Sequence, residues 1–174
     1  MDINNLKDEL ESIEDEEIRN LTRECLEKAP PHFWYRPASS TGKYHAKEEN
    51  EQGGLVLHTK RVFKVACLLL NAWLPPLNSS VTRSACLLHD VCKYGDSYSA
   101  YKYTLNNHPK LAADFVKKVA GDKYNMDKVN AISNAITSHM GRWGPYPSAD
   151  LLMVPENLIV HLADYVATKI HEEV

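Results

Sequence analysis

The sequence has few glycines, no closely spaced cysteine pair and no long apolar run, and each shortage excludes a class of protein. Seven glycines in 174 residues, with 44% hydrophobic and 25% charged side chains, exclude fibrous and disordered chains. The longest apolar runs, such as VACLLL at 65–70, fall short of the roughly 20 residues of a membrane span. The acidic N-terminus lacks the basic start of a signal peptide. We therefore expect one cytoplasmic domain with no membrane association.

The spacing of the cysteines and the net charge indicate which cellular compartment and which partners the protein fits. The cysteines form no CxxC pair, and most lie inside apolar helical patterns: Cys25, Cys67, Cys86 and Cys92. Free thiols in a reducing compartment fit this pattern better than disulfides do. A net charge of −3 gives no general attraction to nucleic acid or to anionic membranes.

The sequence also lacks the alternation of apolar and polar residues that is typical of β-strands. Its apolar residues recur instead with the spacing of an α-helix. Apolar residues at helical spacing in 3–28 predict one long amphipathic helix or two shorter ones. We expect this N-terminal segment, residues 1–29, to pack on a domain formed by residues 30–174. Residues 30–54 lack periodicity and predict a long, ordered, functional loop. Further helices are expected at 55–74, from a cap at Ser79 or Ser80 to near Gly95, from a cap at Asn106 or Asn107 to about 120, from about 127 to 139, and at 155–170. The fold class is all-α.

Histidines and aspartates interrupt these apolar helices at or near their ends. The residues concerned are His58, His89, Asp90, His108, His139 and Asp164. Buried imidazoles and carboxylates are costly unless they are paired, hydrogen-bonded or bound to a metal, and one shared metal site would satisfy all of them. Mixed nitrogen and oxygen ligands are permissive for Mn, Fe, Co, Ni, Zn or Mg. Taken alone, a histidine of this kind is more often a satisfied core or surface residue than a metal ligand.

The order of these motifs is more specific than any pair of residues. His58 within GGLVLHTKRV, His89-Asp90 within ACLLHDVCKYG and Asp164 within HLADYVATKI together resemble the HD-domain metal-dependent phosphohydrolase superfamily, over residues 30–172. The resemblance implies a helical bundle with a metal site at its centre. It also implies one ion on His58, His89, Asp90 and Asp164, and a second on Asp90, His108 and His139.

Within that superfamily, the chain is most similar to the HD domain of bacterial 3′→5′ exoribonucleases. The matching stretches are Lys43-Tyr44-His45, Thr104-Leu105, and Ser138-His139-Met140-Gly141 with Trp143-Gly144. The chain departs from that pattern at Met140 and Cys92, and it has no room for the OB-type module that those enzymes place ahead of the domain. Small substrates are therefore expected in preference to long nucleic acid.

The resemblance implies a hydrolase that cleaves a phosphoester of a nucleotide or short oligonucleotide by attack of a metal-activated water. Asp90 would join the ions, and Lys93, expected on the same helical face, would neutralise charge on the phosphate. The alternative for Lys93 is a lysine favoured by the helix dipole. Candidates for substrate binding are Lys43, Tyr44, His45, Arg142 and Trp143, through ring stacking and phosphate contacts.

Three other functions fit the same residues. One is a non-hydrolytic regulatory protein that binds a nucleotide or metal, another is a di-iron oxygenase, and the third is an interaction protein with a structural metal. The expected partner of the enzyme is a small phosphorylated substrate, and a homo-oligomer built through the N-terminal helix is compatible with the sequence.

Overall fold

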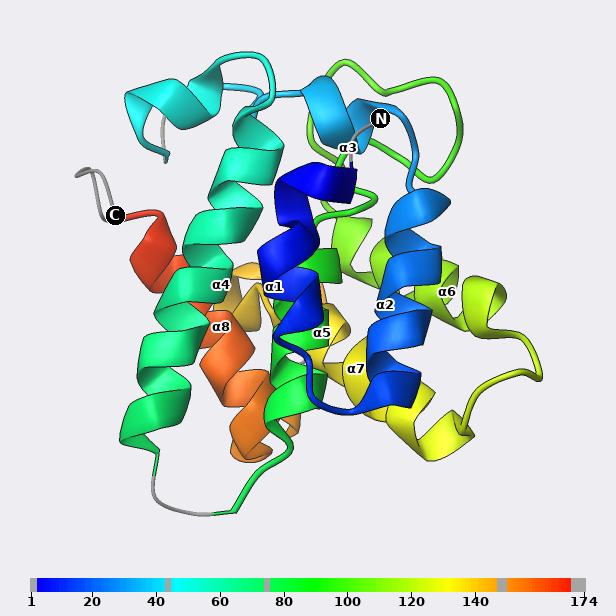
Figure 1. Ribbon diagram of the computed structural model, residues 1–174. Helices are drawn as coiled ribbons and strands as arrows, with labels where there is room; N and C mark the ends of the chain where they lie inside the picture. Colours follow the sequence, from blue (N-terminus) through cyan, green and yellow to red (C-terminus); the bar gives the residue numbers. More distant parts are fainter. Residues whose placement is uncertain (1–2, 43–44, 74–75, 147–149, 170–174) are drawn as a thin grey trace.

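Helices make up all the regular structure in the part of the chain that this computed structural model describes, residues 3–42, 45–73, 76–146 and 150–169. Those residues contain no strand, which confirms the all-α fold. The elements, shown in Figure 1, are η1 (Ile3–Leu6), α1 (Lys7–Glu11), α2 (Glu16–Glu27), α3 (His32–Tyr35), η2 (Lys47–Asn50), α4 (Gly54–Ala72), α5 (Ser79–Leu88), α6 (His108–Ala120), α7 (Met126–Ser138), η3 (Gly141–Trp143), η4 (Leu151–Met153) and α8 (Pro155–Ala167).

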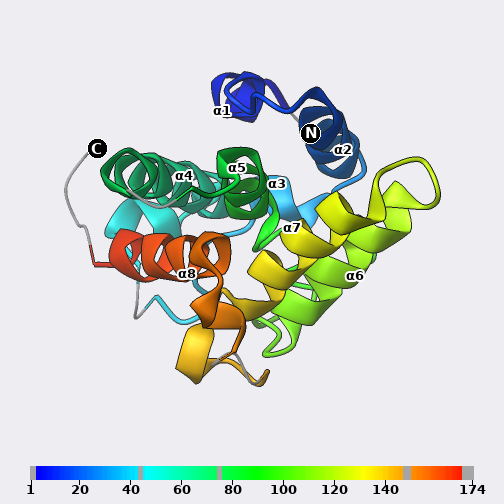
Figure 2. The same cartoon turned by 90° about the horizontal axis from the view of Figure 1, so that it is seen from below.

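The bundle is built around α5, which packs against α4, α7 and α8. Helix α4 lies along α8, and α6 lies along α7. Figure 2 looks along the bundle and shows α1 and α2 as an outer layer on one side, with α8 on the opposite side. The core between them includes the fully buried side chains of Leu87, Leu88, Ile132 and Ile136.

The N-terminal segment forms two helices that share this core. Asp15 separates them, because its side chain accepts a hydrogen bond from the Ile18 amide at 3.0 Å and so caps α2. The Asp15 amide in turn donates to Ser80 Oγ on α5, also at 3.0 Å. Ile13 and Leu21 are buried in the common core. The division of the chain at residue 29 stays a prediction.

Helix α5 begins and ends differently from the sequence prediction. Asn78 caps it, its side chain accepting from the Val81 amide at 3.2 Å, whereas Ser80 receives the bond from Asp15. The expected end near Gly95 is wrong, because α5 ends at Leu88.

A series of tight turns replaces the last part of that expected helix. The amides of Val91, Lys93 and Gly95 each donate to the carbonyl three residues earlier, at 3.2, 2.9 and 2.9 Å. Val91 and Cys92 are nevertheless fully buried, so the apolar pattern continues past the end of the helix. The consequence is that Asp90 lies in a turn directly after the helix.

The described residues of the segment 30–54, which are 30–42 and 45–54, contain α3 and η2, which the irregular sequence does not indicate. Gly53 has a φ of 81°, a conformation that favours glycine. A Cβ atom on Gly54 would overlap the backbone of Glu49. This pair of glycines therefore lets η2 lie directly against the start of α4 and brings Glu49 to the bundle.

The remaining expectations on local structure are met with one difference. All four cysteines are free thiols, as predicted. Helix α8 ends at Ala167, earlier than expected, and Ile170 lies outside the described residues. Among the helices described, none has the length and apolar character needed to cross a membrane.

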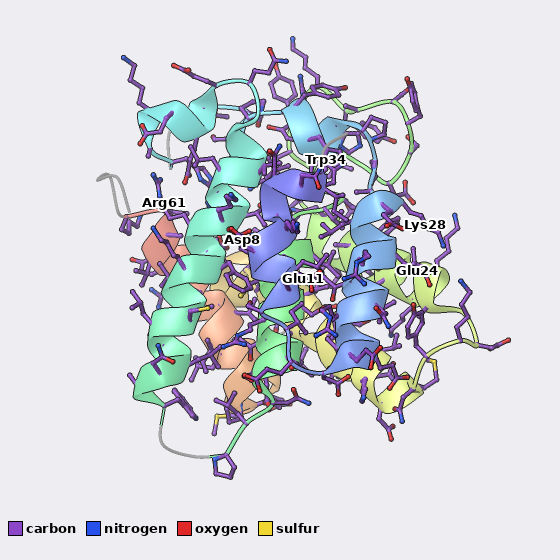
Figure 3. All side chains as sticks on the ribbon, viewed as in Figure 1. Asp8, Glu11, Glu24, Lys28, Trp34 and Arg61 are labelled. Atoms are coloured by element: carbon purple, nitrogen blue, oxygen red, sulfur yellow. The ribbon has the colours of Figure 1, made fainter. Side chains whose placement is uncertain are left out.

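Glu24 on α2 provides a test of how the N-terminal layer is held. Hydrogen bonds from Tyr124, Lys123 and Lys28 hold the pKa of Glu24 at about 2, below its ordinary 4.5, and Figure 3 shows Glu24 and Lys28 on the outside of the helix. Because the folded-state pKa is depressed, this stabilisation is full above about pH 4.5 and is lost as the pH falls toward 2. Urea unfolding should therefore separate wild type from Glu24→Gln at pH 7 and bring them together near pH 2. Exposed Glu27 on the same helix supplies the control Glu27→Gln, and an equal pH dependence in both variants would contradict the assignment.

Candidate metal centre

Four imidazoles and two carboxylates from five helices or their ends meet at one buried point. Helix α4 supplies His58 and α8 supplies Asp164, and His108 is the first residue of α6. His89 and His139 are the C-terminal caps of α5 and α7. The five members other than Asp164 are at most 3% exposed. The structure thus brings together all six residues that the sequence singled out.

Backbone carbonyls orient three of the imidazoles. Nδ1 of His89 lies 2.8 Å from the Cys86 carbonyl oxygen, and Nδ1 of His139 lies 2.7 Å from that of Ile136. Nδ1 of His108 lies 2.6 Å from the carbonyl oxygen of Leu105. A carbonyl only accepts hydrogen bonds, so each Nδ1 carries the proton and donates it. Each Nε2 is left with a lone pair directed at the centre, as in a histidine that binds a metal.

The first group of ligand atoms forms around Asp164. Its Oδ1 atom lies 3.0 Å from His58 Nε2 and 3.9 Å from His89 Nε2. The same His89 nitrogen lies 3.4 Å from Oδ2 of Asp90. These separations are short enough for one ion to contact atoms from His58, His89 and Asp164 together.

The second group uses the other oxygen of Asp90. Oδ1 lies 3.0 Å from His108 Nε2 and 3.7 Å from His139 Nε2, and the two Nε2 atoms are 3.2 Å apart. With both Nδ1 atoms directed at carbonyls, the two Nε2 atoms face each other and the carboxylate of Asp90. A cation between them would contact all three groups. Asp90 is thus able to face two ion positions, one with each oxygen.

Unsatisfied polar atoms mark the same place. His89 Nε2 and Asp90 Oδ1 are buried and have no hydrogen-bond partner among the described residues. Burial and the neighbouring His89 and His108 hold the pKa of His139 at about 3, so this imidazole stays neutral. Burial would raise the pKa of Asp90, but Lys93 and His89 outweigh it and hold the pKa well below the usual range. An anionic carboxylate beside several imidazole nitrogens is a donor set that fits a divalent ion.

Lys93 contacts the centre from the turn that follows α5. Its Nζ donates to Asp90 Oδ2 at 2.6 Å, and both residues are buried. Burial would lower the pKa of Lys93, but Asp90 and Asp164 raise it above its ordinary value. The expectation that Lys93 shares a helical face with Asp90 is wrong, since the helix ends before both; the turn brings the two side chains together instead. Its role toward substrate stays a prediction.

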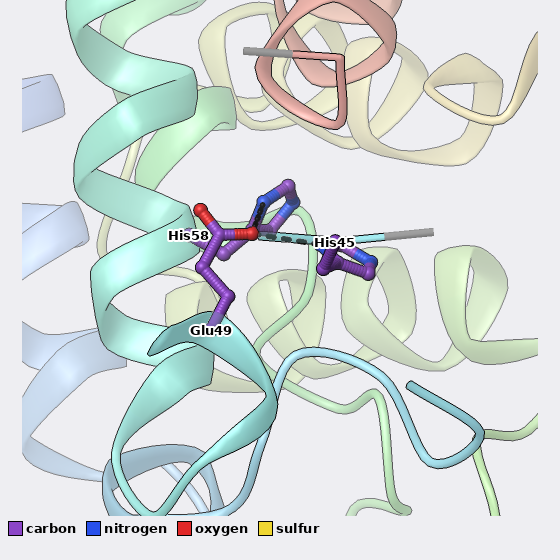
Figure 4. A group of neighbouring side chains, drawn as sticks. All are labelled: His45, Glu49 and His58. Carbon is purple, nitrogen blue, oxygen red and sulfur yellow. Dashed lines mark hydrogen bonds and ion pairs between the residues drawn. The ribbon is translucent and has the colours of Figure 1, made fainter. Parts of the chain in front are cut away.

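Glu49 contacts the candidate centre although it was not among the residues predicted from the sequence. Its Oε2 atom lies 2.9 Å from His45 Nδ1 and 3.4 Å from His58 Nδ1 (Figure 4). On the other side, Arg61 of α4 donates to Oε1 at 2.5 Å. A carboxylate behind a histidine fixes the tautomer and ring orientation of that histidine. Glu49 therefore turns Nε2 of His58 toward Asp164.

The charges around Glu49 follow from these contacts. Burial would raise the pKa of Glu49, yet hydrogen bonds from His45 and His58 outweigh it and hold the pKa at about 2. Burial would likewise lower the pKa of His58, but Asp164 and Glu49 raise it to about 9. A proton on Nε2 of His58 thus occupies the position that faces Asp164, where an ion would replace it.

Glu49 escaped prediction because its neighbours look like solvated charge. It stands within KEEN at 47–50, in a segment with no periodicity, and Glu48 beside it is half exposed. The one signal in the sequence was the pair Gly53-Gly54. Two adjacent glycines before a helix indicate a close backbone approach, and in this structure the approaching backbone is that of Glu49.

A cavity of about 570 Å³ opens beside the centre. His139 and Asp164 form one wall, and Trp143, Tyr165 and Lys169 are among the other lining residues. The rings of Trp143 and Tyr165 stack at 5.1 Å with an angle of 9° between their planes. Of these residues the sequence predicted Trp143 and missed Tyr165 and Lys169.

The other residues predicted to bind substrate are not among the described residues that line this cavity. Arg142 lies over the Trp143 ring at 4.9 Å, so it supports the wall of the cavity. His45 is held by Glu49, and its ring lies edge-on to His58 at 4.5 Å. Lys43 and Tyr44 lie outside the described residues.

A substitution at Gly141 tests the close packing between the segment that follows His139 and the ring of His161 on α8. Its φ is 55°, and a Cβ atom would overlap the ring of His161, whose Nδ1 lies 2.7 Å from the carbonyl oxygen of His139. Gly141→Ala should lower the free energy of unfolding by more than the roughly 1–3 kcal/mol that strain at a left-handed position costs, because the added methyl group also meets the His161 ring. Urea denaturation measures the loss. The control is Gly121→Ala, because Gly121 has a φ of 51° but open space for a Cβ atom; an equal loss in both variants would show that contact with His161 contributes nothing.

Comparison with known proteins agrees with this geometry. The family model of the HD domain matches residues 55–169. No curated protein and no solved structure matches the chain. The matched range contains the six predicted ligands and begins after His45 and Glu49. The narrower likeness to exoribonucleases stays a prediction.

Proposed function

The chain belongs to the HD-domain family, whose members are generally metal-dependent phosphohydrolases, and from this premise we propose that it hydrolyses a phosphoester of a nucleotide or short oligonucleotide. The observation that carries the proposal is the convergence of two imidazole nitrogens on Asp90, with Nε2 of His108 at 3.0 Å and Nε2 of His139 at 3.7 Å from one oxygen. A cation among these atoms would satisfy the buried carboxylate and both nitrogens at once.

The proposed ligands divide into two sets that share Asp90. One set is His58, His89, Asp90 and Asp164, and the other is Asp90, His108 and His139. When bound, divalent ions would lower the pKa of a coordinated water toward about 7 and neutralise phosphoryl oxygens. One or two ions per chain are compatible with these sets.

The chain's own residues would do the rest. The ammonium group of Lys93, held 2.6 Å from Asp90, adds positive charge where an anionic phosphoryl group would enter. The stacked rings of Trp143 and Tyr165 offer a flat apolar surface beside Asp164, and a nucleobase binds such a surface by stacking. Lys169, whose Nζ lies 5.4 Å from the centre of the Tyr165 ring, supplies a cation at the rim for a further phosphate.

Metal content and phosphate release test the proposal. The purified protein is analysed for bound metal, stripped with a chelator, and assayed against nucleoside mono-, di- and triphosphates, cyclic nucleotides and short oligonucleotides with Mn, Fe, Co, Ni, Zn or Mg restored. We expect metal-dependent release from at least one nucleotide. Metal binding without release from any of them would favour a regulatory binding protein. Oxygen consumption with iron in place of phosphate release would favour the oxygenase.

A further inference from the structure

A second cavity, of about 900 Å³, lies between the loop that follows α3 and the loop that leads from α5 to α6. Among the described residues, five tyrosines line it: Tyr35, Tyr94, Tyr98, Tyr101 and Tyr103. We call this cavity the tyrosine groove. We propose that it binds a short stretch of single-stranded nucleic acid, with bases stacked on the tyrosine rings.

The exposure of the rings is the first observation behind the proposal. Tyr98 is 83% exposed, and Tyr101 and Tyr103 are 59% and 57% exposed. Three large rings within six residues of one loop leave a wide aromatic surface in contact with water. Exposed rings gathered around one cavity indicate a surface that binds a partner. Tyrosine suits a flat partner with polar edges, because its ring stacks while its hydroxyl stays hydrated.

The charges of the groove indicate which partner it fits. The charged residues among its described lining are Arg36 and Lys102, both cationic, and the polar ones include Ser39, Ser40 and Ser99. Cations and hydroxyl groups beside exposed rings match a phosphodiester backbone that carries unpaired bases. A duplex would offer no free base faces, so the groove fits a single strand better than a double helix.

The floor of the groove is held in place before any ligand arrives. Arg36 donates to the carbonyl oxygens of Tyr101 and Lys102 at 3.1 and 2.9 Å. The Tyr94 hydroxyl donates to the carbonyl oxygen of Pro37 at 2.9 Å, and Arg36 covers the Tyr94 ring at 4.5 Å. These contacts tie the two loops together across the cavity. A preorganised floor lowers the entropy cost of binding.

The groove shares its backbone with the metal centre. The Leu105 amide donates to the Lys93 carbonyl at 3.0 Å, and the Leu105 carbonyl accepts from His108 Nδ1 at 2.6 Å. The loop that carries the exposed tyrosines therefore begins just after Lys93 and ends on His108. A nucleic-acid strand bound in the groove would therefore contact a loop whose two ends belong to the candidate metal centre. The inference itself requires no hydrolysis and goes beyond the proposed function.

Binding of a labelled oligonucleotide to the metal-stripped protein tests the inference. The probe is a fluorescein-labelled oligothymidylate of about ten nucleotides, within the site sizes known for single-strand grooves, and binding is followed by fluorescence anisotropy in excess chelator. The variant Tyr98→Ser/Tyr103→Ser removes two rings, and Tyr98→Phe/Tyr103→Phe keeps them. Leu68→Ser is the control, because Leu68 is 65% exposed on α4 and does not line the groove.

We expect the serine variant to bind the probe about tenfold more weakly or worse, since each stacked base contributes substantially to such affinities. The phenylalanine variant and Leu68→Ser should bind like wild type, and a duplex of equal length should bind less tightly than the single strand. No binding by wild type, equal binding by the serine variant, or equal binding of the duplex would overturn the inference. Hydrolysis of mononucleotides is assayed separately with metal, so failure of the groove and failure of the proposed activity give different results.

Discussion

Asp90→Asn should abolish metal-dependent phosphate release, by about 10³-fold or more. The amide keeps the shape of the side chain but removes the charge that both candidate ion positions share. Because ions in such sites supply several kcal/mol of transition-state stabilisation, and each 1.36 kcal/mol is a factor of ten in rate, a loss of this size follows. The measurements are metal content by mass spectrometry and phosphate release under saturating metal.

Stability must be separated from chemistry in this variant. Asp90 is the 2.6 Å partner of buried Lys93, and removing one member of a buried pair costs about 3–5 kcal/mol. The double variant Asp90→Asn/Lys93→Met removes both charges and should recover most of that stability while staying inactive and low in metal. Full metal binding by a folded Asp90→Asn protein would contradict the assignment of Asp90 as the shared ligand.

Glu49→Gln should weaken metal binding by about 10- to 100-fold, the usual effect of removing a group that orients a metal-binding histidine. Glu49 faces Nδ1 of His58 at 3.4 Å and takes a hydrogen bond from Arg61 at 2.5 Å. A glutamine amide in its place holds the histidine less firmly. Affinity is measured by competition with a chelator, and activity is measured at rising metal concentration.

The matched control for this variant stands one residue away. Glu48→Gln changes a half-exposed carboxylate that lies 3.4 Å from the same Arg61, so it removes a similar charge without touching His58. If Glu49 acts by positioning His58, excess metal should restore much of the activity of Glu49→Gln, and Glu48→Gln should behave like wild type. Activity that stays low at saturating metal, with normal affinity, would contradict the positioning role.

The sequence predicted most of the centre because its ligands interrupt apolar patterns. His89 and Asp90 follow Leu87 and Leu88, and Asp164 interrupts the apolar side of α8. A polar group at a buried position requires a partner, so each interruption is informative from the sequence alone. The helices were predicted for the same reason, since their apolar residues recur with helical spacing.

What the sequence missed depends on contacts between distant parts of the chain. The end of α5 at Leu88 is hidden because buried Val91 and Cys92 continue its apolar pattern. The role of Glu49 follows from η2 folding back on α4, for which the pair Gly53-Gly54 was the one local signal. Tyr165 looks like one more aromatic residue on α8 until Trp143, from a separate segment, stacks on it at 5.1 Å.

The carbonyl contacts of His89, His108 and His139 bear on how this fold could diversify. Each Nδ1 lies close to a carbonyl three residues earlier in its own segment, so the aim of each ring is set by a single local turn. Changes elsewhere, in loop length or in core side chains, would alter the space around the centre while leaving these ring orientations intact. A change of loops in such a scaffold would therefore alter the cavity beside the candidate centre and leave the directions of its imidazole nitrogens unchanged.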